Sequence, residues 1–187
     1  PEVVRALASQ PVRQAVFASS RSGVTAPSTT AGEPLPIDSE PPPPLENDSE
    51  DWDRVVRSIV SYRHWLYTHP NPDLLVNIEV PSYELFSDDQ LGLRNLATKS
   101  WRYDPPRQPL PVELVRLHQR DAPHVAIVFV RFGPTPPLRV VDPAGRVVQD
   151  SPGVPAGAAL WTLVREPATD RHWRLFKVTP FTSSQPG

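Results

Sequence analysis

At 187 residues the chain is long enough for one domain of ordinary size, or for a smaller domain with an extended segment. Its 26 prolines favour the second arrangement, because proline lacks an N–H donor and is excluded from helix interiors and central strands. The net charge of −2 excludes the basic surplus that nucleic-acid phosphates require, and the absence of cysteine excludes disulfides, thiolate nucleophiles and cysteine-ligated zinc.

The first part of the chain is expected to lack stable structure. Residues 19–50 are rich in proline, serine, threonine and acids and contain no aromatic residue, so they bury too little apolar area to offset their ordering entropy. Residues 41–44 are four prolines that favour polyproline II, a semi-rigid spacer. Residues 3–17 are either a frayed tail or a short helix that docks on the domain or on a partner. We therefore assign residues 1–47 to a proline-rich, largely disordered leader or stalk.

The leader has no signal for membrane insertion. No stretch approaches the roughly 18 apolar residues of a membrane span, and residues 1–20 are too polar for the apolar region of a signal peptide. Because the chain does not begin with methionine, we expect a preceding segment. A membrane contact is expected only through an anchor upstream of Pro1.

A first helix is predicted from about Asp51 to Thr68. Ser49 or Asp48 is expected to cap it, and residues 69–72, which contain two prolines, end it. The stripe along one face consists of Trp52, Val55, Val56, Ile59, Arg63 and Leu66. Arg63 is the only charged residue in this otherwise apolar stripe.

The stretch from Asp73 to Tyr103 fits more than one secondary structure. Residues 74–78 fit either a further helical turn or a short strand, and Pro81 ends that segment. Residues 87–89 are expected to cap a second helix that runs to about Lys99. The apolar face of this helix holds Leu91, Leu93 and Leu96.

From Leu110 the apolar period changes from helical to alternating, which predicts strands. The expected strands cover residues 110–117, 124–132, 138–141, 146–149, 158–165 and 172–178. The turn Asp142-Pro143-Ala144-Gly145 indicates a hairpin. The chain is thus predicted to be α+β, with two or three N-terminal helices packed on a curved, mostly antiparallel sheet of five or six strands. This single domain spans residues 48–181, and residues 182–187 form a disordered tail.

The order of these elements resembles a known family. A long first helix with aromatic residues, a short second helix and a meandering sheet end in Trp161-Thr162-Leu163-Val164-Arg165 and residues 172–178, His-Trp-Arg-Leu-Phe-Lys-Val. This order resembles the nuclear transport factor two-like cone fold, which ketosteroid isomerase and polyketide cyclases share. It is also similar to stalk-tethered actinobacterial proteins of unknown function.

The resemblance implies a carboxylate base inside the cone if the chain is an enzyme. The nearest ingredients are Tyr62, Tyr67, Tyr103, Asp104, His118 and Asp142, and they form no diagnostic spacing. Asp104 and Asp142 are interpreted as exposed structural residues. The five histidines lack the spacing of a metalloprotease helix, and no nucleophile elbow or phosphate-binding glycine loop is present. We expect no cofactor and no metal.

The aromatic residues are the remaining signal for a site. Trp65, Tyr67, Trp101 and Tyr103 are candidates for a ligand- or partner-binding surface between the helices and the sheet. The competing interpretation is that they pack in the core, since a small domain must bury most of its five tryptophans.

Three functional hypotheses follow. The first is a non-catalytic, extracytoplasmic binding or assembly module tethered by a flexible stalk. The second is a small-molecule isomerase- or cyclase-like enzyme with a buried acid or histidine. The third is a cytoplasmic interaction domain whose proline run is a ligand for an aromatic groove. The expected partner is a protein or a small apolar ligand, with no nucleic acid, and a homodimer is possible.

Overall fold

The computed structural model describes residues 41–81, 83–165 and 171–181. Residues 1–40 of the leader predicted at residues 1–47, and the tail predicted at residues 182–187, lie outside the described residues. The described helices are α2 (Trp52–Thr68), the 3₁₀ helix η1 (Pro72–Asn77) and α3 (Glu84–Lys99). The strands are β1 (Arg102–Tyr103), β2 (Val112–Ala122), β3 (Val125–Phe132), β4 (Leu138–Val141), β5 (Val147–Ser151), β6 (Gly157–Val164) and β7 (Arg174–Pro180). The α+β class is confirmed.

Helix α2 has nearly the expected bounds, but a different cap. The Asp51 side chain accepts a hydrogen bond from the Arg54 backbone N–H at 3.2 Å, so Asp51 is the N-cap. Ser49, one of the two expected caps, instead accepts from the Asp51 N–H at 3.3 Å. At the other end, the His69 N–H donates to the Trp65 carbonyl at 2.8 Å.

Helix α3 begins earlier than predicted. Its N-cap is Tyr83, so residues 87–89 lie inside the helix and do not cap it. The expectation was wrong because Asp89 is buried and binds other interior side chains. Leu91, which was placed on the apolar face, is 49% exposed. The buried apolar residues of α3 are Leu85, Phe86, Leu93 and Leu96.

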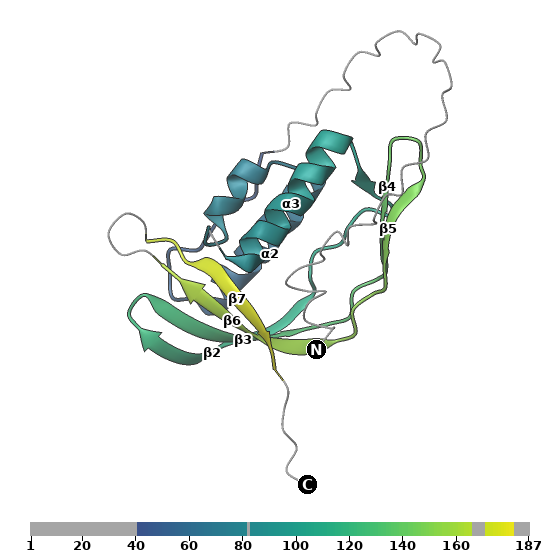
Figure 1. Cartoon of the computed structure of the whole chain (residues 1–187). Helices are drawn as coiled ribbons and strands as arrows, with labels where there is room; N and C mark the ends of the chain where they lie inside the picture. Colours follow the sequence, from purple (N-terminus) through teal and green to yellow (C-terminus); the bar gives the residue numbers. More distant parts are fainter. Residues whose placement is uncertain (1–40, 82, 166–170, 182–187) are drawn as a thin grey trace, which may run out of the picture.

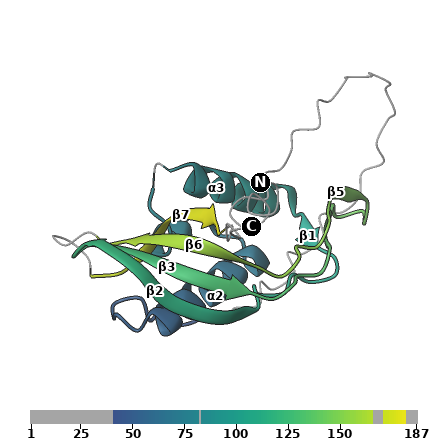
Figure 2. The same cartoon turned by 90° about the horizontal axis from the view of Figure 1, so that it is seen from below.

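The larger sheet has four antiparallel strands in the order β2-β3-β6-β7. Alternate residues of β3, beginning at Ala126 and ending at Phe132, are buried in the core cluster. Helices α2 and α3 lie over one face of this sheet (Figure 1). Seen from below, the four strands run side by side, with β1 and β5 at one end (Figure 2). The core therefore forms between the helices and this face.

The strands do not form the single sheet that was expected, because β1, β4 and β5 make a second, three-stranded sheet. Pairing of β3 with β6 stops at Phe132 and Gly157, and pairing of β4 with β5 starts at Leu138 and Ser151. Between these points the chain contains Pro134, Pro136, Pro137, Pro152 and Pro155. Proline cannot donate to a ladder, so the prolines divide one long ribbon into two sheets.

The two connecting segments stay in contact across this break. The Thr135 N–H donates to the Val154 carbonyl at 2.8 Å, and the Val154 N–H donates to the Thr135 hydroxyl at 3.1 Å. A Cβ added to Gly153 would lie 2.3 Å from the Thr135 carbonyl oxygen, so only glycine allows this approach. These contacts hold the two connecting segments together at the base of the hairpin β4–β5.

The segment before α2 is part of the packed unit. Asn47 is buried, its backbone carbonyl accepts from the Trp173 N–H at 2.6 Å, and its side-chain amide donates to the Trp173 carbonyl at 3.0 Å. Leu45 packs against the core. The domain boundary near residue 48 stays a prediction, but these contacts begin before it.

Membrane insertion has no candidate in the described helices. Across residues 41–81, 83–165 and 171–181, none is both long and apolar enough to span a bilayer.

Candidate functional site

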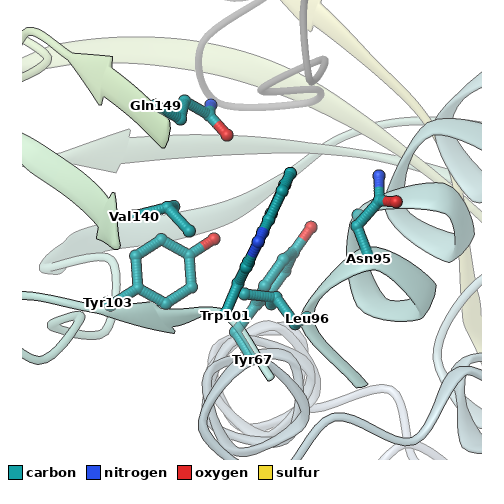
Figure 3. A pocket seen from close by; sticks show the side chains of 8 residues that line it. Tyr67, Asn95, Leu96, Trp101, Tyr103, Val140 and Gln149 are labelled. Carbon is teal, nitrogen blue, oxygen red and sulfur yellow. The ribbon is translucent and has the colours of Figure 1, made fainter. Parts of the chain in front are cut away.

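A small hollow lies where the hairpin β4–β5 meets the ends of the two α-helices. It leaves about 20 Å³ of free space, room for roughly one water molecule. The Trp101 ring lies near its centre, with Asn95 on one side and Tyr103 and Val140 on the other (Figure 3). The lining residues are Tyr67, Gly92, Asn95, Leu96, Trp101, Tyr103, Val140 and Gln149.

Three of the four aromatic residues that were proposed as a binding surface line this hollow. Tyr67, Trp101 and Tyr103 come together there, and the Tyr67 and Tyr103 rings meet edge to face at 6.1 Å. Trp65 lies elsewhere. Its ring stacks on His69 at 5.0 Å and contacts Tyr62 at 5.9 Å.

The path of the chain after α3 brings these rings together. Ser100 ends the helix in the left-handed region with φ of 51°, and Trp101 follows it directly. Tyr103 then enters β1, where it pairs with Val140 of β4. The hairpin therefore fixes Tyr103 against the Tyr67 ring of α2, and Trp101 lies between these elements.

Besides Arg63, whose guanidinium lies 5.8 Å from the centre of the Tyr67 ring, two cations lie over the aromatic rings of the hollow. The Arg107 guanidinium lies 4.0 Å from the centre of the Tyr67 ring and 5.7 Å from that of Tyr103. The Lys99 ammonium lies 4.3 Å from the centre of the Trp101 ring. Cations at these distances are attracted by the negative faces of the rings.

The positive charge of Arg107 also acts on a neighbouring histidine. Burial, then the charges of Arg107 and His69, lower the pKa of His64. Its Nδ1 atom is buried and has no hydrogen-bond partner. The neutral form of the His64 imidazole is therefore favoured.

Behind the hollow lies a buried polar cluster, which we call the interior cluster: Arg63, Tyr67, Glu79 and Asp89. The Tyr67 hydroxyl donates to Asp89 at 2.7 Å, and Arg63 Nε donates to the other Asp89 oxygen at 2.6 Å. Arg63 Nε also lies 3.4 Å from Glu79. Glu79 is 0% exposed and Asp89 is 1% exposed. Tyr67 thus joins the hollow to the interior cluster.

The electrostatics of the interior cluster follow from its burial. Burial alone would lower the pKa of Arg63, but Asp89, Tyr67 and Glu79 raise it, so the guanidinium stays charged. Burial, followed by the charge of Asp89, raises the pKa of Glu79 well above 4.5. The same two causes, in the same order, raise the pKa of Tyr67. The protonated form of Glu79 is therefore favoured, and Tyr67 keeps the proton that it donates to Asp89.

The other acid-base candidates are not brought together. Tyr62 is buried and accepts from the Asn77 amide at 3.0 Å. His118 is exposed on β2, and Asp104 is exposed after β1. Asp142 was expected to be exposed but is buried, because its carboxylate accepts the Ala144 and Arg146 backbone N–H groups, both at 2.9 Å, inside the hairpin turn. The Asp142 carboxylate therefore caps the hairpin turn.

The described residues contain no cluster of side chains that could bind a metal ion. No three His, Cys, Asp or Glu side chains of these residues lie together in a way that would hold an ion.

Sequence reasoning missed the polar residues of the hollow and of the interior cluster. Glu79 and Asp89 were missed, although Arg63 in an apolar stripe is a signal for a buried acid. Asn95 and Gln149 have no comparable signal, since the hollow depends on contacts between distant segments. Arg107 lies in the proline-rich stretch after β1. No helical or alternating pattern there predicts the direction of its side chain.

Comparisons with known proteins give little further information. No protein-family model matches the chain, and no curated protein matches it. Among solved structures, the chain is similar to the crystal structure of the intermembrane space region of the chloroplast protein ARC6. The TM-score is 0.46 at 9% sequence identity, over 70% of this chain and 96% of that one. A similarity at this level carries no conclusion about family or function.

Proposed function

We propose that the chain is a non-catalytic protein-binding or assembly module, and that a partner side chain enters the hollow at Trp101. The observation that carries this proposal is the meeting of Tyr67, Trp101 and Tyr103 around a space of about 20 Å³. Aromatic side chains are rigid and give large contact area at low entropic cost, which is why they dominate protein interfaces.

The size of the hollow favours a protein over a small molecule. Sites for drug-sized ligands enclose roughly 300 Å³ or more, whereas this space holds about one water molecule. A protein partner needs to insert only a small group, such as the methyl group of a side chain, because the remaining contact area lies outside the hollow.

The position of the module relative to the membrane belongs to the same proposal. A proline-rich leader serves as a spacer of limited flexibility, and the proline, serine and threonine content of the leader suits a stalk outside the cytoplasm. We place the module there, tethered by its leader, with a cytoplasmic location as the alternative.

We also propose kinship with the cone-fold family. Support comes from the element order, with α2, η1 and α3 preceding an antiparallel meander whose strands β2, β3, β6 and β7 curve beneath them. Proteins with the cone fold have many different functions, so a relationship to this family does not assign an activity to the chain.

The test is a selection of random 12-residue peptides displayed on phage against the immobilised full chain. Selected peptides are then labelled with a fluorophore and titrated with the full chain in solution, with fluorescence anisotropy of the peptide as the readout. Replacing Trp101 with alanine should weaken binding at least about tenfold, as for a central interface residue. Leu117→Ala, an exposed position on β2, is the matched control and should leave the affinity unchanged.

A second variant separates binding from folding. A Cβ at Gly92 would lie 3.9 Å from the Tyr67 ring, an ordinary contact, so Gly92→Ala should stabilise α3 by about 0.5–1 kcal/mol. The same methyl group occupies part of the hollow and should weaken peptide binding. The proposal is wrong if no peptide is selected, or if selected peptides bind Trp101→Ala and Gly92→Ala as tightly as the original chain.

An isomerase- or cyclase-like enzyme is the second candidate, and one observation favours it. Glu79 is a buried acid with a raised pKa, and Tyr67 links its cluster to the hollow, which resembles the environment of a tuned catalytic acid. Binding of ring-sized apolar compounds that shifts the indole N–H resonance of Trp101 and is lost in Glu79→Gln would favour this candidate over the first.

A further inference from the structure

The charges around the hollow define its partner more closely, and this step rests on the proposed function. Most described arginines have a carboxylate partner; examples are Arg57 with Asp53 at 2.7 Å and Arg120 with Glu50 at 2.7 Å. Arg107 and Lys99 differ. Within the described ranges, neither forms an ion pair, and each instead lies over an aromatic ring of the hollow.

Among the described residues, neither Asp89 nor Asp104 forms an ion pair with these cations. Asp89 lies behind the Tyr67 ring, but Arg63 and the Tyr67 hydroxyl already occupy its oxygens. Asp104 is exposed, and no ion pair joins it to Arg107 or Lys99 in the part of the chain that the structure describes. A chain with a net charge of −2 thus presents a local excess of positive charge at its aromatic hollow.

The arginine is the stronger of the two sites for an anion. It is half-buried, and its guanidinium packs against the Tyr67 ring with the Tyr103 ring nearby. These contacts restrict the side chain, which lowers the entropy that it loses when it binds a carboxylate. Its planar fork of N–H groups suits a carboxylate in a bidentate arrangement. The amides of Asn95 and Gln149 add hydrogen-bonding groups on the lining.

We infer that the partner presents an acidic peptide segment, in which an apolar side chain enters the hollow and a neighbouring Asp or Glu pairs with Arg107. The aromatic lining selects the apolar side chain, and the unpaired guanidinium selects the acid. A purely apolar ligand would leave Arg107 without a counter-charge, and a basic segment would be repelled.

The peptide selection described above tests this inference when the sequences of the binders are read. Acidic residues should be enriched beside a small apolar residue, because the hollow has room for about one water molecule. Arg107→Gln should weaken binding of these peptides at least about fivefold, and the loss should shrink as salt is added, because salt screens exposed charges. Peptide variants with Glu replaced by Gln should lose the same factor and show no further loss with Arg107→Gln.

The matched control is Arg116→Gln. Arg116 also lies over an aromatic ring, 4.9 Å from the centre of Phe129, but on β2 and away from the hollow. It should leave the affinity unchanged. Binders that require Trp101 but are neutral or basic, or that tolerate Arg107→Gln, would overturn the inference and leave the proposed function intact. Failure to find any Trp101-dependent binder would overturn both.

Discussion

The Arg63 guanidinium lies in the interior together with two carboxyl groups and a tyrosine hydroxyl. Removing a charge from water is costly, and the attraction of Asp89 offsets this cost only while both partners are present. The hydrogen bond of 2.6 Å between Arg63 and Asp89, and that of 2.7 Å from Tyr67, satisfy the aspartate. The net stabilisation by such a pair is small, but the loss of one partner leaves a buried charge alone.

Replacing Asp89 with alanine should therefore lower the free energy of unfolding by about 3–5 kcal/mol. Urea denaturation checks this value. The double variant Arg63→Met, Asp89→Leu should lose less than the sum of the single variants, because no unpaired charge remains.

An exposed pair provides the comparison. Arg57 and Asp53 form an ion pair at 2.7 Å on the surface of α2, with both side chains about half exposed. Asp53→Ala should cost less than about 1 kcal/mol. Equal losses for Asp53→Ala and Asp89→Ala would show that the interior cluster is not isolated from water.

At the scale of elements, the extended segment before α2 fastens the last strand to the helices. Asn47 exchanges two hydrogen bonds with the Trp173 backbone, and Trp173 packs edge to face on Trp52 at 5.1 Å. Trp173 is fully buried. The N-terminal segment, α2 and the start of the final strand thus share one cluster, although they are far apart in the sequence.

Replacing Asn47 with alanine should lower the free energy of unfolding by about 1–3 kcal/mol, because the buried Trp173 carbonyl loses its side-chain donor. Chemical denaturation of the full chain measures this loss. Glu46→Ala is the control. Glu46 is about half exposed and pairs with Arg54 at 3.4 Å, so its removal should change stability by less than about 1 kcal/mol. A loss no greater than that of Glu46→Ala would mean that the segment does not hold the last strand.

The prolines between β3 and β4, and between β5 and β6, act at the same scale. They remove ladder donors at five positions, so the second sheet separates from the first. This separation lets the hairpin β4–β5 supply Val140 and Gln149 to the hollow. Without the break, the same residues would continue a single sheet.

For the whole molecule, the raised pKa of Glu79 links stability to pH. The folded state binds the Glu79 proton more tightly than the unfolded state does, so this proton stabilises the fold fully below the ordinary pKa of 4.5. The stabilisation is lost as the pH rises from that value towards the raised pKa of the folded state.

Glu79→Gln should remove this dependence, since glutamine does not titrate. The difference in unfolding free energy between Glu79→Gln and the original chain should grow in favour of the variant as the pH is raised above about 4.5. Denaturant titrations between pH 4 and pH 8 measure it. Parallel curves for the two proteins would contradict the assignment, because all other titrating groups are common to both.

Local patterns in the sequence predicted much of the fold. The helical stripe of residues 52–66 predicted the bounds of α2 within one residue, and the alternation after Leu110 predicted the positions of β3 to β7 to within about two residues. The end of β2 was predicted five residues too early, and β1 was not predicted. These features depend on neighbours along the chain, so the sequence shows them directly. The aromatic candidates Tyr67, Trp101 and Tyr103 were also identifiable as rigid apolar groups.

The sequence by itself determined the α+β class, the first helix and the hairpin turn at Asp142, because each follows from local spacing or turn chemistry. Only the tertiary structure decided that Asp89 faces Arg63, that the strands form two sheets, and that Arg107 lies over Tyr67. Those outcomes depend on contacts between segments that are distant in the chain. Periodicity along one segment carries no information about which distant residue packs against it.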